Sequence, residues 1–192
     1  LLAHRAPGIF PSPAHPRLIG IGHRMGEVLK QIRQVGPHST HVLVRGETGT
    51  GKELVARAIH DASNRKGGFF SVNCGGMPDT LLQSELFGHA RGAFSGADRE
   101  RVGLIEAAHQ GTLFLDEIGD ASPALQVSLL RFLQEGEIRR LGSNRTVQVN
   151  TRIIAATHRA LTAEEGSSFR EDLYARLSRW EILLPPLRDR RE

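Results

Sequence analysis

Apolar residues recur along the chain with two periods that alternate from one segment to the next. Helical spacing of apolar positions is found in four segments: 25–35, 54–59, 80–87 and 124–133. Short apolar runs bounded by glycine or polar residues occupy four others: 41–45, 69–74, 112–116 and 152–157. Such runs are typical of parallel strands that are buried on both faces. The alternation predicts an α/β fold in which a parallel sheet is sandwiched between helices.

Two segments fall outside this alternation. Residues 1–17 contain four prolines and no apolar period, which predicts a linker, so ordered structure is expected from about Leu18 onward. Residues 137–150 have apolar positions at period two on either side of Gly142-Ser143-Asn144, which predicts a hairpin inserted between a helix and a core strand. One folded domain over 18–192 is therefore expected.

Composition narrows the class of protein. The chain has 192 residues, of which 39% are hydrophobic and 24% charged, as in ordinary globular proteins, and its single cysteine, Cys74, excludes an internal disulfide. Apolar runs stay far below the roughly 20 residues of a membrane span, and residues 1–16 lack the apolar centre of a signal peptide. These features predict a soluble, cytoplasmic protein with no membrane partner.

Arginine dominates the positive charge. Lysine and arginine total 25 against 21 acidic residues, a net charge of +4, and all but Lys30, Lys52 and Lys66 are arginines. Arginine suits contacts with phosphates, carboxylates and other subunits, but a high-GC genome enriches it equally well. The charge alone therefore does not predict nucleic-acid binding.

The segment between the strand at 41–45 and the helix at 54–59 reads Gly46-Glu47-Thr48-Gly49-Thr50-Gly51-Lys52, which fits the phosphate-binding loop G-x-x-x-x-G-K. Its glycines allow the positive φ values that turn N–H groups toward phosphate oxygens, the helix N-terminus adds its dipole, and Lys52 adds a full charge. A nucleoside triphosphate is the expected ligand. The alternative is a glycine turn that caps a helix beside a surface lysine. Glu53 stands where a magnesium-binding Ser or Thr usually follows, so the metal must be held elsewhere.

Two adjacent carboxylates end the apolar run at 112–116. Asp116 is expected to hold Mg²⁺, directly or through water, and Glu117 to orient and polarise the water that attacks the γ-phosphate. A strand followed by Asp-Glu is by itself also typical of a helix cap. Together with the phosphate loop, the pair predicts hydrolysis of the triphosphate.

Arg170 and Arg176 lie six residues apart in a predicted helix. Either is a candidate arginine finger, which supplies positive charge to the transition state of phosphoryl transfer. Six residues is not a same-face spacing, so Arg170 is expected at the start of the helix and Arg176 about one and a half turns later. The alternative is that both form ion pairs with their neighbours Glu171 and Asp172.

One further segment reads Gly92-Ala93-Phe94-Ser95-Gly96-Ala97, within a stretch, 85–106, that is otherwise amenable to helix. Glycines at both ends break the helix and are expected to lift Phe94 and Ser95 out as a mobile tip. Spacing alone favours the alternative, a connecting turn whose Phe94 packs in the core.

In combination, these segments resemble the central AAA+ domain of bacterial sigma-54-dependent transcriptional activators. The resemblance runs from about Leu18 to the end of the chain and rests on six segments: 46–53, 84–89, 92–97, 111–120, 129–136 and 169–176. Residues 92–97 are the most specific, because they are similar to the GAFTGA loop with which this family touches the sigma-54 holoenzyme. Ser95 stands where the family usually has threonine. The resemblance implies a P-loop AAA+ α/β subdomain with a parallel five-stranded sheet.

The resemblance also assigns roles at the catalytic centre. It implies that Glu53 is ordinary for the family, and that Arg170 and Arg176 are fingers that reach the nucleotide of a neighbouring subunit in a homo-oligomeric ring, usually a hexamer. Asn73 matches the asparagine that holds the catalytic glutamate, Glu117, until the nucleotide state releases it. For Asn73 an ordinary strand-end hydrogen bond is the alternative.

Two more nucleotide contacts follow from the same resemblance. Thr157 lies at the sensor position, where a polar side chain reports on the γ-phosphate. Ile19 and Gly20 match the entrance that contacts adenine, although an ordinary core contact is equally expected there.

The resemblance implies an ATPase that uses ATP and Mg²⁺ to remodel the closed complex of the sigma-54 RNA polymerase holoenzyme into an open one. The family's helical lid and C-terminal DNA-binding module do not follow before Glu192, so a subdomain truncated before the lid is expected, with DNA bound through a module absent here. An AAA+ regulator independent of sigma-54 is one alternative. A nucleotide-gated binding module without turnover is another, against which the presence of both Asp116 and Glu117 argues.

Overall fold

The computed structural model describes residues 23–161 and 168–190. The predicted linker at 1–17, the expected start of order at Leu18, and the candidate contacts Ile19 and Gly20 lie outside the described residues. Within them, no helix is both long and apolar enough to cross a membrane.

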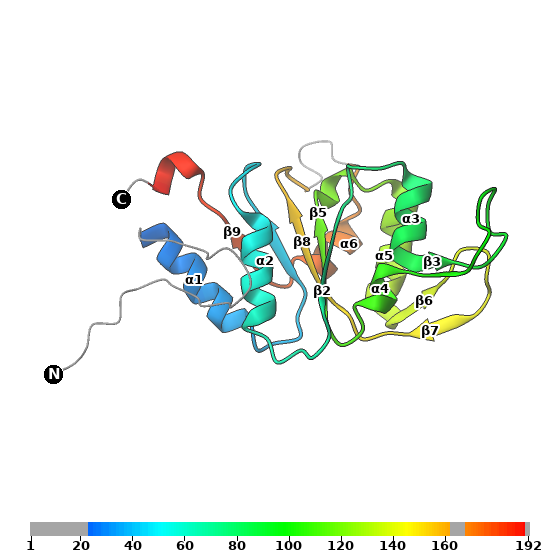
Figure 1. Ribbon diagram of the computed structural model, residues 1–192. Helices are drawn as coiled ribbons and strands as arrows, with labels where there is room; N and C mark the ends of the chain where they lie inside the picture. The colour runs from blue at the N-terminus through cyan, green and yellow to red at the C-terminus, as the bar shows by residue number, and fades with distance from the viewer. Residues whose placement is uncertain (1–22, 162–167, 191–192) are drawn as a thin grey trace.

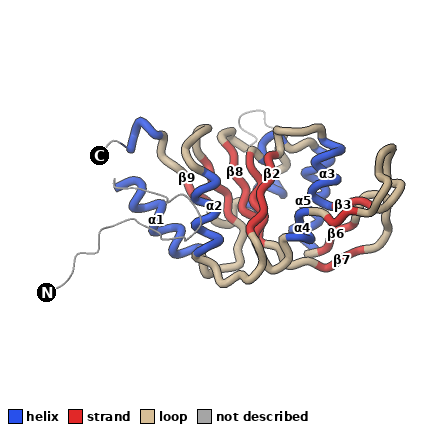
Figure 2. The backbone as a smooth tube through the Cα atoms, in the orientation of Figure 1, coloured by secondary structure: helices blue, strands red, loops and turns tan. Residues whose placement is uncertain are grey.

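Five parallel strands form the central sheet (Figures 1 and 2). In chain order they are β1 (Val42–Arg45), β2 (Phe69–Asn73), β5 (Thr112–Asp116), β8 (Arg152–Thr157) and β9 (Glu181–Leu183). Across the sheet the order is β2-β5-β8-β1-β9. Asn73 is paired with Asp116, and Arg45 with Thr157, so the carboxyl ends of four strands meet at one edge of the sheet. Ligands bind at this edge in parallel α/β sheets.

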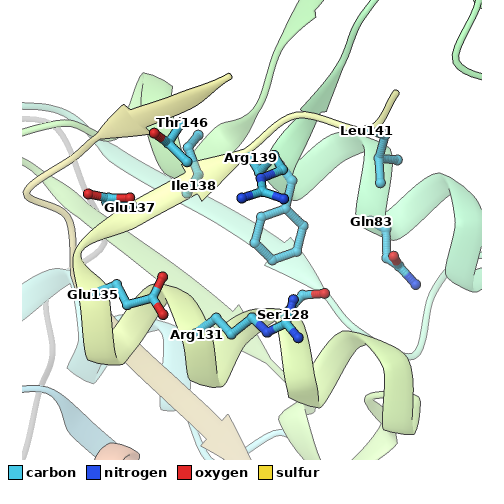
Figure 3. A pocket seen from close by; sticks show the side chains of 10 residues that line it. Gln83, Ser128, Arg131, Glu135, Glu137, Ile138, Arg139, Leu141 and Thr146 are labelled. Carbon is cyan, nitrogen blue, oxygen red and sulfur yellow. The ribbon is translucent and has the colours of Figure 1, made fainter. Parts of the chain in front are cut away.

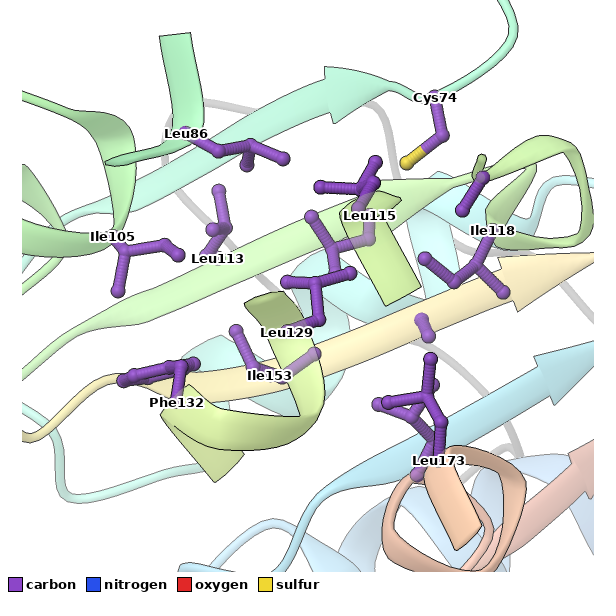
Figure 4. Packing of buried hydrophobic residues seen from close by; sticks show 14 of the residues in the cluster. Cys74, Leu86, Ile105, Leu113, Leu115, Ile118, Leu129, Phe132, Ile153 and Leu173 are labelled. Atoms are coloured by element: carbon purple, nitrogen blue, oxygen red, sulfur yellow. The ribbon is translucent and has the colours of Figure 1, made fainter. Parts of the chain in front are cut away.

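Helices cover both faces, and side chains of the strands alternate between them. Four helices pack on one face: α3 (Asp79–Phe87), α4 (Leu104–Ala107), α5 (Pro123–Glu135) and α6 (Glu171–Leu177). Helices α1 (His23–Val35) and α2 (Lys52–Asp61) pack on the other (Figure 1). In β5, Leu113 and Leu115 enter the first core, seen in Figure 4, while Phe114 enters the second. The expected α/β sandwich with a five-stranded parallel sheet is confirmed.

Local signals explain where the helices begin and end. Helix α5 begins after Ser122, whose hydroxyl accepts from the Leu125 amide at 3.1 Å, and ends at Gly136, where φ is +69°. Helix α1 ends against Arg152, a side chain only 1% exposed, whose guanidinium donates to the carbonyls of Val35 and Gly36 at 2.9 and 3.0 Å. A buried cation therefore satisfies carbonyls that a helix end leaves open.

Two short ribbons lie at the end of the molecule opposite α1 (Figure 2). One pairs β3 (Gly88–His89) with β4 (Arg101–Val102), and the other pairs β6 (Glu137–Arg139) with β7 (Thr146–Gln148), where a hairpin was expected. Within 85–106, helix is therefore confined to the two ends, and a ribbon forms between them, because Gly88 takes φ +77° and a side chain there would clash with the Arg101 carbonyl. Two 3₁₀ turns, η1 (Ile118–Asp120) and η3 (Leu187–Arg190), complete the described elements used below.

Candidate nucleotide site

The loop at 46–51 joins the carboxyl end of β1 to the first turn of α2. Gly49 and Gly51 have φ values of +79° and +90°, which side chains rarely adopt, and Gly51 is the N-cap of α2 without a side-chain cap. Thr50 closes the turn, since its hydroxyl donates to the Glu47 carbonyl at 2.6 Å. The uncapped N–H groups of the first helical turn are therefore available to an anion.

Lys52 fills the centre of this loop. Its side chain is only 6% exposed, and its Nζ lies 3.1 Å from the Gly46 carbonyl and 3.4 Å from the Glu47 carbonyl. Nζ also forms an ion pair with Glu117 Oε1 at 3.3 Å. The buried ammonium therefore connects the phosphate loop to the carboxylate at the end of β5.

Asp116 and Glu117 are adjacent in the sequence, but the protein shifts their pKa values in opposite directions. Burial, followed by the neighbouring charge of Glu117, raises the pKa of Asp116 above its usual range. Partial burial acts the same way on Glu117, but the hydrogen bond from His158 and the charge of Lys52 outweigh it, so the pKa of Glu117 is lowered. Glu117 also has φ +49°, a conformation rare outside glycine. Glu117 is thus held ionised, as a proton acceptor must be.

The residue that faces Glu117 from the end of β8 is His158. Its Nδ1 lies 2.6 Å from Glu117 Oε2, and its amide donates to the same oxygen at 3.3 Å. Thr157 is fully buried, and its hydroxyl accepts from the Arg159 amide at 3.0 Å. The sequence singled out Thr157 for the nucleotide and gave His158 no contact with Glu117. Only the adjacency of β5 and β8 brings His158 to that carboxylate.

Asn73 lies beside Asp116 in the β2–β5 register. Its side-chain oxygen accepts from the Gly75 amide at 2.8 Å, the strand-end hydrogen bond that the sequence left as an alternative. In the described part of the chain, the side-chain bonds of Glu117 go to Lys52 and His158. A restraint of Glu117 by Asn73 therefore stays a prediction.

A cavity of about 690 Å³ opens beside the loop. It is lined by Gly46, Glu47 and His158, by the first turn of α1, and by apolar residues 183–186 after β9. Cavities of this size hold small organic ligands, with apolar walls for rings and a few polar groups for orientation. The site thus offers a phosphate-binding loop continuous with a partly apolar chamber.

Two arginines of η3 donate hydrogen bonds to the phosphate loop. They were not identified as site residues from the sequence. Arg188 donates to both carboxylate oxygens of Glu47, at 2.9 and 2.8 Å. Arg190 donates through Nη2 to the backbone carbonyl of Thr50 and to that of Pro185, both at 2.8 Å. The segment after β9 therefore braces the loop. No spacing rule finds this contact, because it depends on where the chain turns back after Leu183.

The two candidate fingers belong to α6. Arg170 is the N-cap residue, and its guanidinium forms two bonds with Asp172, at 3.0 and 2.8 Å, which raise its pKa. Arg176 is half-buried in the last turn, and its side chain forms no ion pair or hydrogen bond with any other residue that the structure describes. Arg170 thus lies at the start of the helix, as the spacing predicts. The ion-pair alternative is observed for Arg170 but not, within the described residues, for Arg176.

The segment 92–97 is the turn between β3 and β4, at the end of the molecule away from α1 (Figure 1). The Gly92 amide donates to the Ala97 carbonyl at 2.8 Å, and Gly92 and Gly96 have φ values of +78° and +101°. Phe94 is 41% exposed, and its ring meets that of His89 edge-on, with centroids 5.0 Å apart. Phe94 therefore lies at an exposed tip and not in the core.

Another cavity, of about 240 Å³, lies apart from the loop (Figure 3). Its walls come from α3, α5 and the β6–β7 hairpin, with Arg131 and Arg139 opposed by Glu135 and Glu137. It is smaller than a nucleotide needs and none of the residues of the phosphate loop lines it. The cavity at 46–51 is therefore the candidate nucleotide site.

Comparison with known families decides the assignment. The family described as the Sigma-54 interaction domain matches residues 18–183. The chain belongs to this family. The resemblance inferred from the sequence is thereby confirmed, and the α/β sandwich is an AAA+ domain of the sigma-54 interaction family.

Sequence relatives of this sigma-54 interaction domain are transcriptional regulators. The Nif-specific regulatory protein of Herbaspirillum seropedicae is 54% identical over 177 residues, which cover 91% of this chain and 33% of the relative. The regulatory protein AtoC of Escherichia coli is 54% identical over 171 residues, 88% of this chain and 37% of the relative. The chain thus spans about a third of the length of these relatives.

Solved structures agree with the sigma-54 interaction domain. The crystal structure of NtrX from Brucella abortus in complex with ADP has a TM-score of 0.83 and 37% identity, covering 91% of this chain and 38% of NtrX. The complex of the same protein with ATP gives a TM-score of 0.82 over 92% of this chain and 40% of NtrX. At 37% sequence identity, the fold is thus shared with NtrX over more than nine-tenths of this chain.

Proposed function

We propose that this domain binds ATP with Mg²⁺ on the loop at 46–52 and hydrolyses it, and that the cycle drives the Phe94 tip against the sigma-54 RNA polymerase holoenzyme. The outcome is conversion of a closed promoter complex into an open one. The observation that carries this proposal is the ion pair between Lys52 and Glu117, in which the ammonium of the phosphate loop meets a carboxylate at the end of β5. The ADP and ATP complexes of NtrX, 37% identical, support the same ligand here.

Binding divides between the loop and the cavity. The amides of residues 47–49 and 51 and the Lys52 ammonium face the phosphates, because the amides of Gly46 and Thr50 already donate to the carbonyls of Thr157 and Glu47. The side chains of Thr50 and Glu53 lie beside them, near the start of α2. The base and ribose occupy the 690 Å³ cavity, whose apolar wall follows β9. Outside the described residues, Ile19 and Gly20 are proposed to complete the adenine contact.

The donor set fits Mg²⁺. Asp116 offers carboxylate oxygens at the strand end, and burial, followed by the charge of the neighbouring Glu117, raises its pKa; a bound cation would oppose both effects. The described residues contain no cluster of three or more His, Cys, Asp or Glu side chains that would cage a metal alone. This suits Mg²⁺, which usually takes one or two carboxylates and completes its shell with phosphates and water. When bound, Mg²⁺ neutralises charge on the phosphates.

Glu117 is proposed to activate the attacking water. Its ionised carboxylate, held by Lys52 and His158, accepts the proton as water attacks the γ-phosphate. When nucleotide fills the loop, Lys52 turns toward the phosphates and frees one oxygen of Glu117. Asn73 is proposed to restrain Glu117 in another nucleotide state, and Thr157 to transmit γ-phosphate occupancy along β8.

Arg170 and Arg176 are proposed to act on a neighbouring subunit. Neither bonds to the loop at 46–52 or to Asp116 and Glu117 of its own chain, within the described residues. Positive charge from α6 then completes the next subunit's site in a homo-oligomeric ring, in which a hexamer is expected. The whole protein is proposed to bind DNA through a module outside this chain and to work in the cytoplasm.

The test of the proposal has two parts, made on the complete gene product. ATPase activity per mole of subunit should rise with protein concentration, because fingers supplied by a neighbour act only after assembly. A transition-state analogue of ATP should allow co-purification with sigma-54. Specific activity independent of concentration would contradict the shared site, and turnover without sigma-54 capture would favour a sigma-54-independent AAA+ regulator. Binding without turnover would identify a nucleotide-gated module.

A further inference from the structure

Gln126 is a polar side chain sealed inside the helical layer. It lies in the first turns of α5 and is 1% exposed, between apolar neighbours that include Leu125 and Leu129. Both ends of its carboxamide are bonded: Nε2 donates to the Ala121 carbonyl at 2.9 Å, and Oε1 accepts from the Arg170 amide at 2.8 Å. A buried carboxamide without such partners would be costly, so these two bonds fix its orientation.

The two partners of Gln126 belong to different functional segments. Ala121 is the C-cap of η1, the single turn whose N-cap is Glu117, and its amide donates to the Ile118 carbonyl at 3.1 Å. Arg170 is the N-cap of α6 and the first of the two proposed fingers. The carboxamide therefore connects the turn after the catalytic carboxylates to the backbone of the finger.

Arg170 is fixed at two points. Gln126 holds its backbone amide, while Asp172 holds its guanidinium with two bonds at the surface, where both side chains are nearly half exposed. Exposed ion pairs exchange with water and contribute little, whereas Gln126, at 1% exposure, has little access to water that could replace its bond to the Arg170 amide. The backbone position of the finger thus depends on Gln126 more than on Asp172.

We infer that Gln126 is a positioning residue that links the hydrolytic turn of one subunit to the arginine which that subunit presents to its neighbour. The inference rests on the proposed function, because it requires Arg170 to act across a subunit boundary. A displacement of η1 moves the Ala121 carbonyl, the carboxamide follows, and the start of α6 moves with it. Gln126 touches no nucleotide and acts only through Arg170.

Loss of the two hydrogen bonds of Gln126 should impair the neighbouring subunit's site and spare ATP binding by the same subunit, which a general loss of stability would not do. In Gln126→Met, a side chain of similar length cannot bond either partner, so Arg170 loses its backbone anchor while the loop at 46–52 of the same subunit is intact. ATP affinity should stay within about twofold, and turnover of the homo-oligomer should fall about tenfold to hundredfold, the loss typical of a misplaced catalytic group. The faulty part is the finger, which serves the next subunit.

Mixed oligomers of the complete gene product test the inference. Gln126→Met supplies an intact site with a faulty finger, and Lys52→Ala supplies an intact finger with a dead site. Mixing the two should give ATPase activity several-fold above the sum of the separate proteins. A mixture of Arg170→Ala with Lys52→Ala is the reference. Thr151→Val is the matched control for the loss of a buried side-chain hydrogen bond, because the Thr151 hydroxyl donates to the Ile105 carbonyl just before the amino end of β8.

The outcomes separate the inference from the proposed function. If the Arg170→Ala mixture regains activity and the Gln126→Met mixture does not, Gln126 serves its own site or only the core, and the inference is overturned. If neither mixture regains activity, the shared site itself fails and the inference falls with it. Thermal unfolding shows whether Gln126→Met folds. If it does not, Gln126→Glu, which keeps an oxygen for the Arg170 amide, should retain finger function in the same mixture, and its loss would overturn the inference.

Discussion

Lys52 and Glu117, 65 positions apart in the sequence, form an ion pair of 3.3 Å in which the lysine side chain is 6% and the glutamate 16% exposed. The pair links the first turn of α2 to the end of β5. In the proposed cycle the two charges have different tasks, because the lysine binds phosphates and the glutamate accepts a proton from water. Their substitution should therefore give two different defects.

Lys52→Ala should abolish measurable ATP binding, while Glu117→Gln should bind ATP and fail to turn it over. Loss of a charged donor weakens affinity by at least about tenfold, and loss of a general base slows turnover by about a hundredfold or more. Calorimetric titration with ATP and phosphate release measure the two steps. Normal turnover in either variant would contradict the assignment of the site.

Phe94→Ala should leave ATPase activity within about twofold, because Phe94 is 41% exposed and, among the residues that the structure describes, its ring pairs with His89 alone. Capture of sigma-54 in the presence of the transition-state analogue should be lost. Leu81, on α3, is 51% exposed, and Leu81→Ala is the matched control for loss of an exposed apolar side chain. Promoter opening retained by Phe94→Ala would remove the tip from the mechanism.

Arg190→Gln should weaken ATP binding more than Arg188→Gln. Arg190 bonds a backbone carbonyl of the phosphate loop, whereas Arg188 pairs with the side chain of Glu47, where both partners are more than half exposed. Exposed pairs contribute little, so about a tenfold loss of affinity is expected for Arg190→Gln and almost none for Arg188→Gln. Equal effects in a titration with ATP would show that the brace acts through charge alone.

His41 should make folding stability depend on pH. Burial, with nearby arginines adding to it, lowers the pKa of His41 to about 4 in the folded chain, while its Nδ1 accepts from the Ile153 amide at 3.1 Å. The unfolded chain binds the proton near pH 6.5, so the contribution of His41 is complete above that pH and is lost as the pH falls toward 4. The loss should approach about 3 kcal/mol.

The variant His41→Asn tests the pH dependence, because its side-chain oxygen can replace Nδ1 and does not titrate. Urea unfolding at pH 7 and pH 4.5 should show a smaller pH-dependent loss in His41→Asn than in the natural chain. His38→Asn, at an exposed position, is the control and should follow the natural chain. The same slope in all three proteins would mean that His41 is not the responsible group.

The sequence predicts the parts of this fold that are long or strongly patterned. The runs ending at Arg45, Asp116 and Thr157 lie within one residue of β1, β5 and β8, since each is a continuous apolar segment buried on both faces. Strand β9 was not found from its pattern, because three residues with only Ile182 buried carry no periodicity. Its existence depends on pairing with β1.

The candidate site divides in the same way. Lys52, Asp116 and Glu117 were identified because loop chemistry and strand ends leave local signals. His158, Arg190 and Gln126 were not assigned their contacts, because each meets its partner through the order of the strands or the path of the chain after them. Contacts of this kind can be predicted only after the strands and the segments that follow them have been placed in space.

Two glycines lie at the base of the β3–β4 ribbon that carries the Phe94 tip. Gly88 and Gly103 approach so closely that a side chain on Gly88 would strike the backbone of residues 101–103, and one on Gly103 would strike that of residues 86–88. The two chain segments that lead to and from the tip, β3 and β4, are therefore held close together where they leave the domain. An insertion or substitution between residues 89 and 101 would therefore change the tip, which is proposed to contact a partner, without moving the sheet and the phosphate loop.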